Sequence, residues 1–169
     1  MSAPKLNRKL HRIGAIVAAV PVLVILVSGL VLQLKKEVAW IQPSTVRGSS
    51  TELSIGFDRV LEIASSVPEA EIETWDDVDR LDVRPERGML KVRAKNRWEV
   101  QIDAKTGDVL QVAYRRSDLI ESLHDGSWFH DGAKLWLFLP AGLILLGLWG
   151  TGLYLWALPH LVRRRRRVR

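Results

Sequence analysis

Two long apolar runs lie near the two ends of the chain. From Ile13 to Leu34 there are 22 residues without a charged side chain, and from Leu135 to Leu158 there are 24. At about 1.5 Å of rise per residue, a helix of either length crosses a hydrocarbon core of about 30 Å. The pattern therefore predicts two transmembrane helices, at 13–34 and 135–158.

A cleaved secretory signal is the alternative interpretation of the first run, because basic residues precede it. The run is longer than the apolar part of a signal peptide, which has about 7–15 residues. Lys35, Lys36 and Glu37 follow it, where a signal would have small residues and a cleavage site. We therefore expect an uncleaved membrane anchor.

The segment between the two runs has first the period of a helix and then the alternation of strands. Apolar residues recur at helical spacing before Pro68, at Leu53, Phe57, Val60, Leu61 and Ala64. Short alternating runs follow at 71–75, 78–84, 89–94, 97–103 and 109–114. We predict an α+β membrane protein, in which two transmembrane helices flank one helix packed on an antiparallel meander of three to five strands.

The basic residues are concentrated outside the two runs. Four Lys or Arg precede the first run and six follow the second, whereas all acidic residues lie between 35 and 134. By the positive-inside rule, both termini are cytoplasmic and the middle segment lies across the membrane, although Lys35 and Lys36 oppose this orientation. The predicted segments are a basic N-terminus 1–12, the span 13–34, a linker 35–50, a domain 51–117, a junction 118–134, the span 135–158 and a tail 159–169.

The arginine run of the tail is expected to anchor the topology and to contact lipid headgroups of the bilayer. This run comprises Arg163, Arg164, Arg165, Arg166 and Arg167. A basic chain also invites a nucleic-acid interpretation, but no recognition module accompanies the run, so we expect no nucleic-acid partner.

Several kinds of catalytic site are excluded by the sequence. The chain has no cysteine, which removes thiolate zinc sites, iron–sulfur clusters and cysteine catalysis. It also has no nucleophile elbow, no phosphate-binding glycine loop and no nicotinamide or flavin fingerprint. We expect no catalytic residues and no independent enzyme.

The stretch SLHDGSWFHDG, at 122–132, repeats a His-Asp-Gly motif before the second run. His124 and His130 are six residues apart, which on a helix places them about 240° from each other, unlike the i, i+4 pair of a zinc helix. We expect a turn at the membrane surface and no metal site.

The sequence WEVQIDAKTGDVLQV, at 98–112, resembles a PepSY domain. Four further motifs are similar to those of the PepSY-associated transmembrane family: Leu10-His11-Arg12, Ser28-Gly29, Leu123-His124-Asp125-Gly126 and Gly152-Leu153-Tyr154-Leu155-Trp156. This resemblance covers nearly the whole chain. It implies a two-pass protein of the bacterial inner membrane with a PepSY-like domain in the periplasm.

The resemblance implies two different functions. PepSY domains in peptidase propeptides and anchored modulators imply an accessory or regulatory protein that modulates a peptidase or a membrane complex. Larger relatives that carry haem imply the alternative, a small haem b electron-transfer subunit linked to iron metabolism. Either function requires another membrane or periplasmic protein, or a second copy of the chain.

The candidate haem ligands are His11, His124 and His160. His11 lies at the cytoplasmic end of the first span, and His124 lies before the outer end of the second. The hydrocarbon core separates them, so within one copy they do not ligate the same haem. His11 can face His160, or His124 can pair with its copy in a dimer or with a partner subunit. The competing explanation is ordinary helix packing, for which the small residues are Ala15, Ala18, Ala19, Gly147, Gly150 and Gly152.

Overall fold

The computed structural model describes residues 3–167, and it describes the side chains of residues 4–159. The chain divides into two compact units, and each is described here by itself. The sheet unit is Val31–Ile120, and the span unit is Met1–Leu30 with Glu121–Arg169. Two helices, α1 (Ala3–Gln33) and α3 (Arg116–Asp125), begin in one unit and end in the other.

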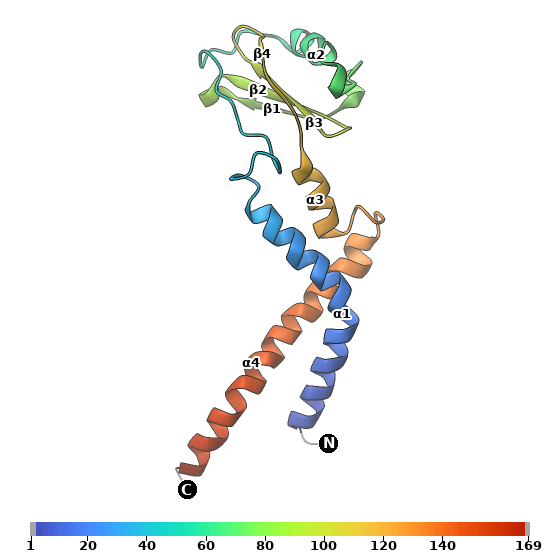
Figure 1. The fold of residues 1–169 in the computed structure, drawn as a ribbon, viewed down its shortest axis with the longest axis vertical. Coiled ribbons are helices and arrows are strands. Elements are labelled where there is room, and N and C mark those ends of the chain that lie inside the picture. Colours follow the sequence, from blue (N-terminus) through green and yellow to red (C-terminus); the bar gives the residue numbers. More distant parts are fainter. Residues whose placement is uncertain (1–2, 168–169) are drawn as a thin grey trace. The chain divides into compact units, whose positions relative to one another are not determined.

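The sheet unit contains an antiparallel meander of four strands (Figure 1). The strands are β1 (Val78–Arg84), β2 (Met89–Ala94), β3 (Trp98–Asp103) and β4 (Val109–Tyr114), and they pair in chain order. Short turns join them, including a 3₁₀ turn, η3 (Pro85–Arg87), which ends at Gly88 with a positive φ of 61°. Four of the five predicted strands are therefore present.

The fifth predicted strand, at 71–75, is not formed. Two 3₁₀ turns, η1 (Pro68–Ala70) and η2 (Trp75–Asp77), stand on either side of it. The Asp77 carboxylate accepts hydrogen bonds from the backbone N–H groups of Glu73 and Thr74. These local bonds occupy donors that a strand would have offered to a neighbour, which explains why alternation alone predicted the wrong structure.

One face of the sheet is apolar and is covered by α2 (Phe57–Ser65). Val60, Ile63 and Ala64 of this helix are buried against the strands. The helix was expected to begin near Leu53, but it begins four residues later. Backbone N–H groups of Ser54 and Ile55 both donate to the carbonyl of Ala104, so this part of the chain stays extended beside the sheet.

The opposite face of the sheet is polar, and it is buried as well. The segment 41–50, which runs along the sheet in blue to teal in Figure 1, covers it. Val46 N–H donates to the Gln101 side chain, which in turn donates to the Ser44 carbonyl. Ser49 N–H donates to the Asp103 carboxylate. This segment therefore belongs structurally to the sheet.

The span unit contains α1 up to Leu30 and α4 (Leu139–Arg167), which follows a single π-helical turn, η4 (Lys134–Phe138). The stretches Pro4–Gln33 and Lys134–Pro159 are long and apolar enough to cross a membrane. Figure 1 shows the two helices crossing. A Cβ placed at Gly14 would contact Ile144 and Leu148, and His11 contacts Thr151, so the helices run antiparallel. The predicted fold class is confirmed.

Candidate functional site

His124 is bound to the facing span helix by a hydrogen bond. Its Nδ1 lies 2.9 Å from the hydroxyl of Ser28 on α1. That hydroxyl has one hydrogen, which it directs to carbonyl oxygens of its own helix, those of Val24 and Ile25. Ser28 therefore accepts a hydrogen bond from His124 Nδ1–H, and Nε2 takes no part in this contact.

His11 makes the same kind of contact near the other end of the helices. Its Nδ1 lies 2.9 Å from the hydroxyl of Thr151 on α4, and this hydroxyl donates to the Leu148 carbonyl at 3.0 Å. The same argument assigns the Nδ1–H tautomer to His11. Ser28 follows His11 by 17 residues on one helix, so the two histidine contacts are about 25 Å apart along it.

Two short motifs recognised in the sequence come together around His124. A Cβ at Gly29 would lie 3.2 Å from His124 Cε1, so glycine beside Ser28 leaves room for the ring. Gly126 has a φ of +86°, and a Cβ there would collide with the ring of Phe138. The Ser-Gly motif of the first span and the Leu-His-x-Gly motif thus form one packing arrangement.

The second histidine of the 122–132 stretch is placed differently. His130 is exposed, and its Nδ1 accepts a hydrogen bond from Gly132 N–H. Among the described residues, Asp125 interacts with Ser127 and Lys134 and not with an imidazole. Although burial raises the pKa of Asp125, these contacts outweigh it and lower the pKa to about 2. Within the described residues there is no group of three metal-ligating side chains.

The small residues predicted to pack between helices differ in their surroundings. Ala18 is buried, whereas Ala15 and Ala19 are exposed. A Cβ at Gly147, Gly150 or Gly152 would meet no atom within 4 Å among the described residues. Close approach within the chain occurs at Gly14, which was not predicted. The three glycines of α4 stay candidates for contact with another helix.

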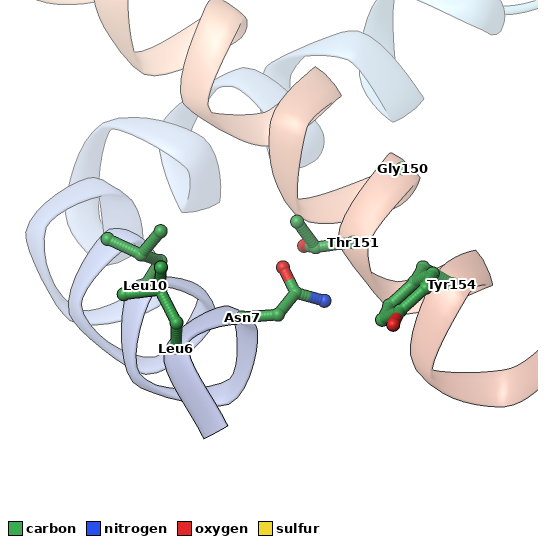
Figure 2. Close-up of a pocket in the computed structure, with 6 residues that line it drawn as sticks. All are labelled: Leu6, Asn7, Leu10, Gly150, Thr151 and Tyr154. Carbon is green, nitrogen blue, oxygen red and sulfur yellow. The ribbon is translucent and has the colours of Figure 1, made fainter. Parts of the chain in front are cut away.

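A cavity of about 480 Å³ opens between α1 and α4, as Figure 2 shows. It is lined mainly by apolar atoms of Leu6, Leu10, Gly150 and Tyr154. Asn7 points from α1 toward α4 in this view, and its buried Nδ2 has no hydrogen-bond partner among the described residues. Among the described side chains, no histidine lines this cavity.

These positions can be compared with what a bis-histidine haem needs. His11 and His124 are separated along the span, so in one copy they do not present two imidazoles to one porphyrin. The side chain of the third candidate, His160, lies outside the described part of the chain, as do those of Arg163, Arg164, Arg165, Arg166 and Arg167. A single copy therefore shows no complete haem site among its described side chains.

The polar face of the sheet holds a buried cluster of charges that sequence reasoning did not find. Its centre is Glu99, which is fully buried and lies 3.0 Å from Lys91 Nζ and 2.7 Å from Arg115 Nη1. Arg93 Nε lies 3.6 Å from Glu99 Oε2, the oxygen that Arg115 contacts, and Asp118 pairs with Arg115. We call Lys91, Arg93, Glu99, Arg115 and Asp118 the Glu99 cluster.

The surroundings of the Glu99 cluster shift the pKa values of its cations. Burial lowers the pKa of the Lys91 amine, and the charges of Arg84 and Arg115 lower it further, against the opposing effect of Glu99. Burial lowers the pKa of Arg93 in the same way. Burial lowers the pKa of Arg115, but the hydrogen bond and charge of Asp118 and the charge of Glu99 outweigh this effect. The pKa of Arg115 is therefore raised. One sequence signal could have indicated part of this cluster: Arg93 and Glu99 have opposite charges and are cross-strand partners on β2 and β3.

A family model described as the PepSY-associated TM region matches residues 6–169. The match includes both candidate spans, the two histidine contacts and the sheet between them. No curated protein and no solved structure gives a match. Because the family model covers nearly the whole chain, the protein is a membrane protein that belongs to the PepSY-associated transmembrane family.

Proposed function

We propose that the protein is a membrane-anchored accessory or regulatory protein whose sheet unit acts on a partner, either a peptidase or a membrane complex. The observation that carries this proposal is that His11 and His124 each contact a hydroxyl of the facing helix. These contacts give both histidines a role in holding the membrane anchor together. The sheet unit has its own core and is the part available for a partner.

The proposal includes a topology in which the sheet unit is periplasmic. Support comes from the antiparallel helices, because the basic flanks lie at the N-terminal end of α1 and the C-terminal end of α4 and so belong to the same side of the membrane. Because the chain has no cysteine, single-cysteine labelling tests the topology cleanly. Lys105→Cys should react with a membrane-impermeant maleimide in intact spheroplasts, and Lys9→Cys should react only after lysis. The reverse pattern would exclude a periplasmic sheet unit.

The regulatory role is tested by measuring proteolysis in membranes that contain a peptidase encoded beside this chain. The rate should change when the full chain is present, and a matched chain that lacks residues 51–114 should have no effect. If the shortened chain has the same effect, the sheet unit is not the acting part. If neither chain changes proteolysis or assembly of a membrane complex, the proposal fails.

A haem b electron-transfer subunit is the second candidate, and one observation favours it. Both His11 and His124 contact the facing helix through Nδ1, which leaves Nε2 as the nitrogen that could bind a metal, and metal-ligating histidines are usually oriented by such a bond at the other nitrogen. A second copy or a partner would have to bring the facing imidazole. The bound haem would supply one-electron chemistry.

The absorption spectrum of the full chain, purified after expression with haem supply, distinguishes the two candidates. Stoichiometric Soret and α bands that disappear in His11→Ala or His124→Ala, but not in His130→Ala, would overturn the purely regulatory proposal. Purified protein without stoichiometric haem would remove the electron-transfer candidate.

A further inference from the structure

A second cavity, of about 430 Å³, lies in the sheet unit between the polar face and the segment that covers it. Its lining contains six cationic side chains and no carboxylate: Lys35, Lys36, Arg84, Arg87, Lys91 and Arg93. The remaining lining residues, at 42–45, are uncharged. A concave site of one sign concentrates its field, so this cavity attracts anions.

The inner wall of the cavity is formed by two members of the Glu99 cluster. Lys91 is 1% exposed, and its hydrogen bond to Glu99 uses one of three N–H donors. Arg93 Nε is buried without a hydrogen-bond partner among the described residues. Unsatisfied buried donors are rare in folded proteins, and the acceptor with which this one forms an ion pair, Glu99 Oε2, lies 3.6 Å away, beyond hydrogen-bond distance.

The Glu99 carboxylate does not neutralise the cavity by itself. It is shared between Lys91 and Arg115 and also accepts a hydrogen bond from Gln101. Asp82 pairs with Arg93 and Asp118 pairs with Arg115, so the three cations of the cluster face three carboxylates, those of Asp82, Glu99 and Asp118. Lys36, Arg84 and Arg87 are further cations that line the cavity, as does Lys35.

We propose that this cavity binds a phosphate group, held by Arg93 and Lys91 at its inner wall and by Arg84 and Arg87 at its rim. A carboxylate has two acceptor oxygens, whereas a phosphate group spreads its charge over more oxygens and matches several lysines and arginines at once. The cavity volume exceeds what a single carboxylate would fill.

The phosphate has two possible sources. Lys35 and Lys36 follow the last residue of α1 by two and three positions, and basic residues next to a span meet lipid headgroups. An anionic phospholipid therefore fits, and so does a soluble phosphate ester that enters from the aqueous side. The shared chemistry is the phosphate group, and the experiment distinguishes its source.

The test uses the full chain, labelled with ¹⁵N, in nanodiscs of phosphatidylcholine. One arm adds inorganic phosphate or glycerol phosphate to these nanodiscs, and the other replaces part of the lipid by phosphatidylglycerol. The Arg93 Nε–H resonance reports occupancy of the inner wall, and calorimetry of the soluble probes gives their affinity. The variant Arg84→Gln/Arg87→Gln removes two exposed cations of the rim. The control variant Arg59→Gln/Lys105→Gln removes two exposed cations that do not line the cavity.

We expect the Arg93 resonance to shift on binding, and the rim variant to bind at least tenfold more weakly while the control binds as the unsubstituted chain does. A response to glycerol phosphate identifies a soluble ester, and a response only to phosphatidylglycerol identifies a lipid. No response in either arm overturns the proposal. An equal loss in the rim and control variants also overturns it, because net charge alone would then explain the binding.

Discussion

Alternate residues of β2 and β3 enter two buried layers of opposite chemistry. Val92, Val100 and Ile102 point to the apolar face, where α2 covers them and their side chains are inaccessible. Lys91, Glu99 and Gln101 point to the other face and are equally inaccessible, but they are covered by the segment 41–50 and by Arg115. The same strands thus bury hydrocarbon on one face and charge on the other.

The two faces are expected to respond differently to substitution. On the apolar face a smaller side chain loses contact area and leaves a cavity, and both costs grow gradually with volume. On the polar face, removal of one partner leaves another charge buried without compensation. The volume removed therefore sets the loss of stability on the apolar face, whereas the charge removed sets it on the polar face.

Glu99→Gln is the strongest test of this difference, because it changes charge with almost no change in shape. Lys91 and Arg115 would lose their shared carboxylate in a buried site. We expect the free energy of unfolding to fall by about 3–5 kcal/mol. Denaturant unfolding of the full chain in detergent, followed by near-ultraviolet circular dichroism, measures the change.

The matched control is Glu62→Gln, which removes a carboxylate from an exposed pair with Arg59 on α2. Its expected cost is at most about 1 kcal/mol. Adding Lys91→Met to Glu99→Gln should restore part of the lost stability, because it removes one uncompensated charge. Equal costs for Glu99→Gln and Glu62→Gln would show that the cluster has no special role.

Asp103 provides an intermediate test and one that depends on pH. Its buried carboxylate accepts hydrogen bonds from the backbone N–H groups of Ser49, Lys105 and Thr106. Although burial raises the pKa of Asp103, these hydrogen bonds outweigh it and hold the pKa far below its usual value. This contribution is therefore complete above the unfolded-state pKa of about 3.9 and is lost as the pH falls toward the folded-state value.

Asp103→Asn should lower the free energy of unfolding at pH 7 by about 1.5–3 kcal/mol, the range for hydrogen bonds to a charged group. It should also flatten the decline in stability below about pH 4. Unfolding curves of both chains between neutral and acidic pH measure this. A constant difference between the chains at all pH values would contradict the pKa argument.

The sequence predicted the parts of the fold that depend on local pattern. Apolar runs predicted the two spans, and alternation predicted the four strands that form, one that does not, and the apolar face that carries Val92 and Val100. His11 and His124 were chosen as candidates from short motifs, and both histidines contact the facing span helix.

Burial of the polar face was not predictable from the same pattern. Alternation normally indicates a solvated second face, and the covering segment 41–50 has no regular period. Its position depends on long-range contacts, such as Gly48 N–H with the Arg87 carbonyl and the close approach of Gly88 to Ser50. For the same reason, the serine and threonine partners of the histidines were not identified, since hydroxyls are common in span helices.

Ile102→Val is the smallest expected effect and completes the comparison on the apolar face. Ile102 is fully buried beside Val100 in the core under α2, and the substitution removes one methylene group without changing charge or branching at Cβ. We expect a loss of about 0.5–1.5 kcal/mol in the free energy of unfolding, measured in the same detergent as Glu99→Gln. Val83→Ala, at an exposed position, should change it by no more than about 0.5 kcal/mol. If Ile102→Val were as costly as Glu99→Gln, then packing volume and not charge compensation would set the sensitivity of both faces, and the Glu99 cluster would be only another part of the core.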